Sequence, residues 1–226
     1  MNKYLVIIPL ILTACAGEDF SADLLAGTGH NGGKLAENKF EISAHGPDLL
    51  KAKEYFEKKA TQLCNNKPYQ IKGSALQSYS SREYGGTPGY FITVPHKIMQ
   101  GVVLCEGYQP SAKTRYTVGE VKSSVQAPSI FNKYIKEELE FELAKHDMLA
   151  DSAGANTINI TVTGYKAPPI AAELLFGNLA PHALTTQVNV NGSPISVTTE
   201  EGLGDEASYV NFSSEHAKNI VKQMNN

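Results

Sequence analysis

Residues 39–68 read KFEISAHGPDLLKAKEYFEKKATQLCNNKP and decide the fold of the first half of the chain. The segment begins with an alternation of apolar and polar residues, which is the period-2 pattern of a strand with one buried face. Pro47 and Asp48 then favour a helix start, because Pro fits the first helical turn and an acidic side chain complements the helix dipole. The helix is expected to end before Pro68, with Cys64 in its last turn. The apolar positions that carry the two patterns are Phe40, Ile42 and Ala44 for the strand, and Leu49, Ala52, Phe56, Ala60 and Leu63 for the helix.

Three short strand patterns follow at residues 69–71, 89–94 and 98–105, separated by glycines and prolines. The last of them is almost wholly apolar, which is typical of a central strand that lies under a helix. Residues 39–110 are therefore predicted to form a small β-α-β-β unit.

The second half repeats the alternation of strand and helix patterns without repeating the sequence. Residues 115–122 and 156–165 alternate as strands, and between them a helical pattern runs from Pro128 toward Leu149. Asn191-Gly192 lies between two further strand patterns and predicts a hairpin with a type I′ turn. Residues 209–212 suggest a last strand, and Ser213 a cap for a C-terminal helix. The predicted fold class is α+β: a signal peptide and tether, then two small sheet-plus-helix units, the second at 114–226.

Composition and charge exclude several classes of protein. The chain has 226 residues, 42 % of them hydrophobic, with 20 Lys+Arg against 23 Asp+Glu and a net charge of −3. This is ordinary globular composition, so a collagen-like, coiled-coil or disordered protein is excluded. Without a dense basic run, nucleic acid is not an expected partner.

The N-terminus has the pattern of an export signal. Lys3 is the only charge before a short apolar run at 4–12, and small residues follow at 13–15. A helix over that run rises about 14 Å and falls short of a hydrocarbon core of about 30 Å. The pattern predicts a secretory signal over 1–14, the alternative being a buried N-terminal helix.

Leu12-Thr13-Ala14-Cys15 resembles the lipobox of bacterial lipoproteins. The resemblance implies cleavage before Cys15 and a lipid anchor on its thiol and amine. Ala16, where an Asp would retain such a protein at the inner membrane, resembles the outer-membrane sorting signal of enteric-type bacteria. It therefore implies an envelope protein held at the outer membrane with its folded part in the periplasm. Two or three acyl chains anchor a protein almost permanently, whereas one chain exchanges.

Export also bears on the other cysteines. With Cys15 committed to lipid, Cys64 and Cys105 remain in an oxidising compartment where disulfides persist. The prediction is a Cys64–Cys105 disulfide, against the alternative of two free thiols.

Residues 15–38 are rich in glycine and small polar residues, and we predict that they form a flexible tether. They contain Gly27-Thr28-Gly29-His30-Asn31-Gly32, which matches G-x-G-x-x-G letter for letter. A dinucleotide site requires those glycines between a buried strand and a helix. Neither pattern flanks them here, so the interpretation is a linker and no cofactor is predicted.

No catalytic or metal-binding motif stands out. The chain lacks a G-x-S-x-G elbow, a Walker loop and H-E-x-x-H. Its histidines do not stand at ligand spacing from one another, from cysteines or from carboxylates, so no metal site is predicted. They are His30, His45, His96, His146, His182 and His216. A triad assembled from distant residues stays open, because triads are recognised by geometry.

Tyrosines concentrate in the region 69–116, where an exposed row of rings would stack on a glycan. The alternative is ordinary strand propensity. The tyrosines concerned are Tyr69, Tyr79, Tyr84, Tyr90, Tyr108 and Tyr116.

The segment APPIAAELLFGNLAPHAL at 167–184 is long for a connection between strands, and long connections often carry function. Its apolar residues either complete the core or form a docking element for a partner or a membrane surface. The candidate docking residues are Ile170, Leu174, Leu175, Phe176 and Leu179.

These patterns favour a non-enzymatic binding or assembly factor of the bacterial envelope. Its expected partners are the membrane, through the lipid, and an envelope protein or glycan. The order of elements in 114–226 is similar to that of small Gram-negative lipoproteins that assist transporters or lipopolysaccharide assembly. The alternatives are a lipid-anchored hydrolase with a dispersed site and a surface-exposed exclusion or adhesion lipoprotein.

Overall fold

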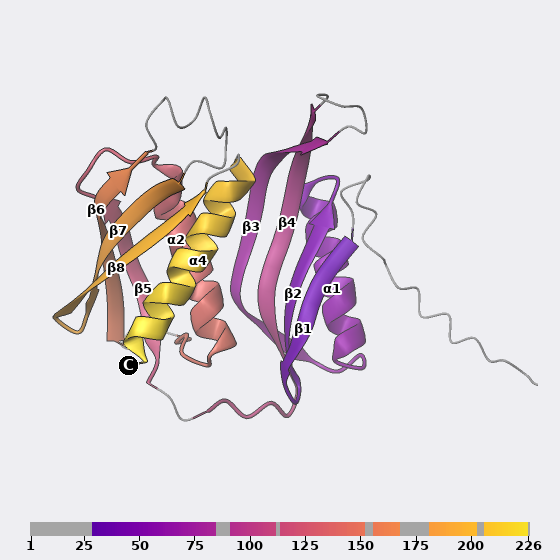
Figure 1. The fold of residues 1–226 in the computed structure, drawn as a ribbon. Coiled ribbons are helices and arrows are strands. Elements are labelled where there is room, and N and C mark those ends of the chain that lie inside the picture. Colours follow the sequence, from indigo (N-terminus) through magenta and orange to yellow (C-terminus); the bar gives the residue numbers. More distant parts are fainter. Residues whose placement is uncertain are drawn as a thin grey trace, which may run out of the picture.

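The computed structural model describes residues 29–84, 91–111, 114–151, 156–167, 181–202 and 206–225. These residues form two four-stranded sheets and three helices, so the chain is an α+β protein with two sheet-plus-helix units, as predicted. Figure 1 shows α2 (Ile130–Lys145) and α4 (Glu206–Met224) between the two sheets, and α1 (Leu49–Leu63) on the outer side of the first sheet. None of the described helices is long and apolar enough to cross a membrane.

The first sheet has the order β1-β2-β4-β3, with antiparallel neighbours throughout. Its strands are β1 (Gly29–Ala36), β2 (Lys39–Gly46), β3 (Tyr69–Tyr84) and β4 (Phe91–Cys105). The face toward α1 is apolar, and Ile42 and Phe56 meet there in a core that is closed to solvent. Helix α1 begins where Asp48 accepts a hydrogen bond from the Lys51 amide at 2.8 Å. It ends before Asn65, whose positive φ of 53° breaks the helical path.

Strand β1 corrects the predicted tether. The prediction that 15–38 is a flexible tether is wrong for residues 29–36, which pair with β2. The linker interpretation of G-x-G-x-x-G is wrong for Gly29–Gly32 in the same way. A side chain at Gly32 would place its Cβ against the Glu41 carbonyl of β2, so the glycine permits close pairing of the backbones.

Strands β3 and β4 are longer than the three short strand patterns suggested. Pro95 lies inside β4, although the sequence pattern placed a break there. Strand β2 ends opposite Lys97, so among the described strands β4 has a neighbour on only one side at Pro95. A residue without an N–H group is tolerated at such an edge position.

The second sheet has the order β5-β6-β7-β8. Strands β5 (Tyr116–Ser123) and β6 (Asn156–Lys166) are parallel and are joined through α2, and the remaining pairs are antiparallel. Strands β7 (Pro181–Val190) and β8 (Ser193–Gly202) form the predicted hairpin, with positive φ at Asn191 and Gly192. The second core lies between this sheet and the two helices α2 and α4.

The predicted strand at 209–212 is wrong, because these residues belong to α4. Ser213 is therefore not a cap but a buried residue inside the helix. Phe212, Ala217 and Ile220 follow a helical spacing and are fully buried in the second core. Burial of that stripe outweighs the local strand propensity of four residues.

Candidate functional site

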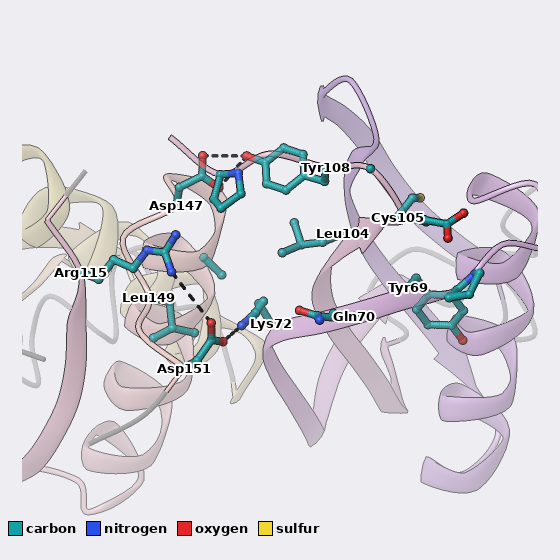
Figure 2. Close-up of a pocket in the computed structure, with 15 residues that line it drawn as sticks. Tyr69, Gln70, Lys72, Leu104, Cys105, Tyr108, Arg115, Asp147, Leu149 and Asp151 are labelled. Atoms are coloured by element: carbon teal, nitrogen blue, oxygen red, sulfur yellow. Dashed lines mark hydrogen bonds and ion pairs between the residues drawn. The ribbon is translucent and has the colours of Figure 1, made fainter. Parts of the chain in front are cut away.

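A cleft of about 470 Å³ opens between the two units. The first unit contributes the start of β3, the end of β4 and the segment after it. The second unit contributes the end of α2 and the residues that flank the start of β5. Figure 2 shows charged side chains from both units around this opening, together with Tyr69, Tyr108 and Leu104 of the first unit.

One side of the cleft is closed by a buried ion pair. Lys39, at the start of β2, is only 2 % exposed, and its Nζ donates to Asp147 Oδ1 at 2.6 Å. The same Nζ donates to the carbonyl of Lys145 at the end of α2, at 2.7 Å. The hydroxyl of Tyr108 donates to Asp147 at 2.7 Å, and the Ser111 amide donates at 3.2 Å. We call Lys39, Tyr108 and Asp147 the clamp, because it ties the first unit to the end of α2.

The contacts within the clamp shift the pKa values of Asp147 and Tyr108. Burial alone would raise the pKa of Asp147, but the hydrogen bonds from Lys39, Tyr108 and the Ser111 amide lower it to about 2. Burial, together with the hydrogen bond to Asp147, raises the pKa of Tyr108. Asp147 is therefore ionised and already committed to its partners at neutral pH.

The opposite side of the cleft carries a second set of charges. Lys72 of β3 and Asp151 form an ion pair, and Nη1 of Arg115 lies 3.9 Å from the other oxygen of Asp151. Figure 2 shows Arg115 and Lys72 converging on this carboxylate from different units. Burial and the nearby Arg115 lower the pKa of Lys72. We call Lys72, Arg115 and Asp151 the charged triad.

The predicted Cys64–Cys105 disulfide is present, with 5.2 Å between the two Cα atoms. It joins the end of α1 to the end of β4, where Cys105 lines the cleft. The disulfide therefore fixes one wall of the cleft to the first core.

Behind the cleft, the units meet through polar groups. Glu138 of α2 is 2 % exposed, and its Oε1 accepts hydrogen bonds from Gln77 and Gln100, both at 2.7 Å. Burial raises the pKa of Glu138, although the two glutamine donors oppose this shift. Gly73 lies so close to Glu140 of α2 that a Cβ would fall 2.5 Å from the Glu140 carbonyl oxygen. The first sheet thus approaches α2 closely, through a face on which Gln100 alternates with the buried apolar residues Ile98 and Val102, whereas its face against α1 is apolar.

The histidines fall into separate environments. His45 and His96 lie 6.2 Å apart by ring centroids, and Tyr79 stacks on His96 at 5.0 Å. His216 is fully buried between Thr186 and Thr199, with both hydroxyls 2.8 Å from its ring nitrogens. Burial lowers the pKa of His216 to about 4. Across the described ranges, no three His, Cys, Asp or Glu residues are grouped in a way that suits a metal ion.

The tyrosines do not share one face of the first sheet. Tyr69 packs with the core on the α1 side, whereas Tyr79 pairs with His96 on the face toward α2. Tyr108 belongs to the clamp, and Tyr116 packs against the second core. Only Tyr69 and Tyr108 line the cleft among the tyrosines whose side chains are described.

Other predicted site residues lie outside the described residues. This holds for Cys15 and for the candidate docking residues Ile170, Leu174, Leu175, Phe176 and Leu179. The cleft itself was not predicted. Its charged residues are far apart in sequence, Lys39 and Asp147 by 108 positions, so no local sequence pattern indicates it.

The sequence and the structure were compared with known proteins. No family model and no curated protein matches it. Among solved structures, one titled "Crystal structure of uncharacterized protein" matches with a TM-score of 0.33 and 16 % sequence identity. That match covers 52 % of this chain and 96 % of the other.

Proposed function

We propose that the protein is a non-enzymatic binding factor of the bacterial envelope, held at the outer membrane by lipid on Cys15, with the cleft between its units as the ligand site. The apolar run and the lipobox-like residues before Cys15 support the anchor. The disulfide is consistent with an exported protein, because disulfides persist outside the cytoplasm.

The cleft is the single observation that carries the binding proposal. Its volume of about 470 Å³ falls in the range of small-ligand sites, and it lies between two units, where such sites are common. Its walls combine apolar side chains with a few charged groups, of which Asp147 is held in place by Lys39 and Tyr108. This is the composition of a site that orients a ligand.

The chemistry of the lining favours binding over hydrolysis. The described residues that line the cleft include no serine, threonine, histidine or free thiol, and each carboxylate among them is paired with a lysine. Asp147 accepts hydrogen bonds from Lys39 and Tyr108, so it is poorly placed to accept a further proton from substrate.

In-cell photo-crosslinking tests the proposal. A photoreactive residue replaces Gln70, an exposed residue of the cleft, and a matched probe replaces Leu50, which is 75 % exposed on α1. A discrete adduct from position 70 and none from position 50 is the expected result. Absence of any adduct from position 70 contradicts the proposal.

The anchor has its own test. Cys15→Ser should leave an uncleaved precursor without acyl mass, because both cleavage and lipidation depend on the thiol in proteins with a lipobox. Mass spectrometry of the membrane fraction measures both properties. Normal maturation of this variant would show that the N-terminus is not a lipoprotein signal.

A further inference from the structure

We propose that the charged triad is a carboxylate-binding site in which Lys72 and Arg115 receive the acidic group of a ligand, and that Asp151 occupies this position when the ligand is absent. The inference rests on the proposed binding function and names the chemistry of its ligand.

The charges around the cleft are unequal. On the clamp side, Lys39 and Asp147 neutralise one another at 2.6 Å, and Glu106, a further carboxylate of the lining, lies 4.0 Å from the ammonium group of Lys67. In the triad, two cations share the single carboxylate of Asp151. One positive charge is therefore left over among the described residues of this side, and it favours an anion.

The geometry leaves Arg115 available to a ligand. Its Nη1 lies 3.9 Å from Asp151, which is beyond hydrogen-bond distance, and within the described ranges it donates no hydrogen bond to another residue. A guanidinium group prefers two parallel hydrogen bonds to one carboxylate. Asp151 does not accept two such hydrogen bonds from Arg115, whereas the carboxylate of a ligand that replaces Asp151 can accept both.

The side chain of Asp151 shows that a carboxylate fits between Lys72 and Arg115. It is also easily displaced from this position. Its side chain is 59 % exposed, and exposed ion pairs contribute little to stability. The two cations come from different units, so the carboxylate lies at the junction between them. The aspartate thus acts as an internal competitor for the ligand.

The remainder of the ligand is expected to be apolar or aromatic. Leu104 and Leu149 lie beside the triad in Figure 2, and Tyr69 lies on the far side of the cleft. The volume accommodates a small organic acid or the last residues of a peptide with a free C-terminus. Both sources share the same group, a carboxylate next to an apolar body.

Binding of N-acetylphenylalanine to the full chain in detergent, followed by ligand-observed NMR, tests the inference. The primary amide of the same compound is the neutral control, and an acetylated tripeptide ending in phenylalanine separates a peptide terminus from a small acid. We expect saturable binding of the acids and none of the amide. Tighter binding of the tripeptide than of N-acetylphenylalanine would identify the carboxylate as a peptide terminus, and equal or weaker binding would identify it as that of a small acid.

Three variants locate the binding. Arg115→Gln should abolish it, whereas Asp151→Asn should tighten it about fivefold, the most that an exposed ion pair is expected to contribute. Glu120→Gln is the matched control, because Glu120 is an exposed carboxylate 3.9 Å from Lys122 on β5 and does not line the cleft. It should change the affinity by less than twofold.

Equal binding of acid and amide, or unchanged affinity in Asp151→Asn, overturns the carboxylate inference. If the carboxylate inference fails in this way but position 70 still crosslinks a partner in cells, the proposed function is not contradicted. Absence of the crosslink contradicts the proposed function itself, whatever the acids do.

Discussion

The clamp makes the most specific energetic prediction. Lys39→Met removes the cation but keeps most of the apolar stem, so Asp147 remains largely enclosed with only Tyr108 and the Ser111 amide as partners. Removing one member of a buried ion pair typically costs 3–5 kcal/mol, because the other charge stays buried without compensation. The side chain of Asp147 is 13 % exposed, which places the expected loss near the lower end, about 3 kcal/mol.

Chemical denaturation followed by circular dichroism measures this loss as a change in the free energy of unfolding. Lys34→Met is the matched control, because Lys34 forms an ion pair with Glu37 at 2.6 Å while both side chains are more than half exposed. It should cost less than about 0.5 kcal/mol. The double variant Lys39→Met with Asp147→Asn should recover part of the loss, since the uncompensated charge is gone. A loss below about 1 kcal/mol in Lys39→Met would refute the assignment of Lys39 and Asp147 as a buried ion pair that ties the first unit to the end of α2.

Three further changes test other parts of the structure. His216 has a pKa of about 4 when folded and an ordinary value of 6.5, so the unfolded chain takes up its proton first. The free energy of unfolding should therefore fall by about 3 kcal/mol as the pH drops from 6.5 to 4. A His216→Gln variant whose free energy of unfolding falls just as much over this pH range would contradict the prediction. Glu138→Leu leaves two buried glutamine donors without their acceptor and should cost about 2–4 kcal/mol in the same assay; a stability equal to wild type would show that the polar contact is dispensable. Cys105→Ser, or reduction of the disulfide, opens a loop of 41 residues and should lower the free energy of unfolding by about 4 kcal/mol. An unchanged melting temperature would indicate that the first core is stable without the bond to Cys64.

Local patterns predicted the parts of the fold that depend on neighbours in sequence. The apolar stripe through Phe56 predicted α1, and Asn191-Gly192 predicted the hairpin, because each signal lies within the element that it specifies. Counting the cysteines, with Cys15 assigned to a lipid anchor, was enough to predict the Cys64–Cys105 disulfide.

The failures have physical causes. Strand β1 is an edge strand rich in glycine, and it pairs through backbone groups that leave no alternation of side chains to detect. Residues 209–212 carry strand propensity but lie in a helix whose apolar stripe continues beyond them. The cleft depends on pairs such as Lys39 with Asp147, which come together only after both units have folded. One signal for the interface was present: Glu138 stands within the apolar stripe of α2, where a carboxylate requires buried partners.

The proposed function requires that a ligand of the envelope enters the cleft between the two units. The most direct measurement is crosslinking from position 70 in cells that carry the additional substitution Leu104→Trp. Leu104 is paired with Gln70 across β3 and β4 and is only partly buried, so a larger ring there should fill the cleft while the fold remains. We expect the adduct to disappear while the melting temperature stays within a few degrees of that of the parent protein. An adduct of unchanged yield would mean that the partner contacts the outer surface of β3 and that the cleft is not its binding site.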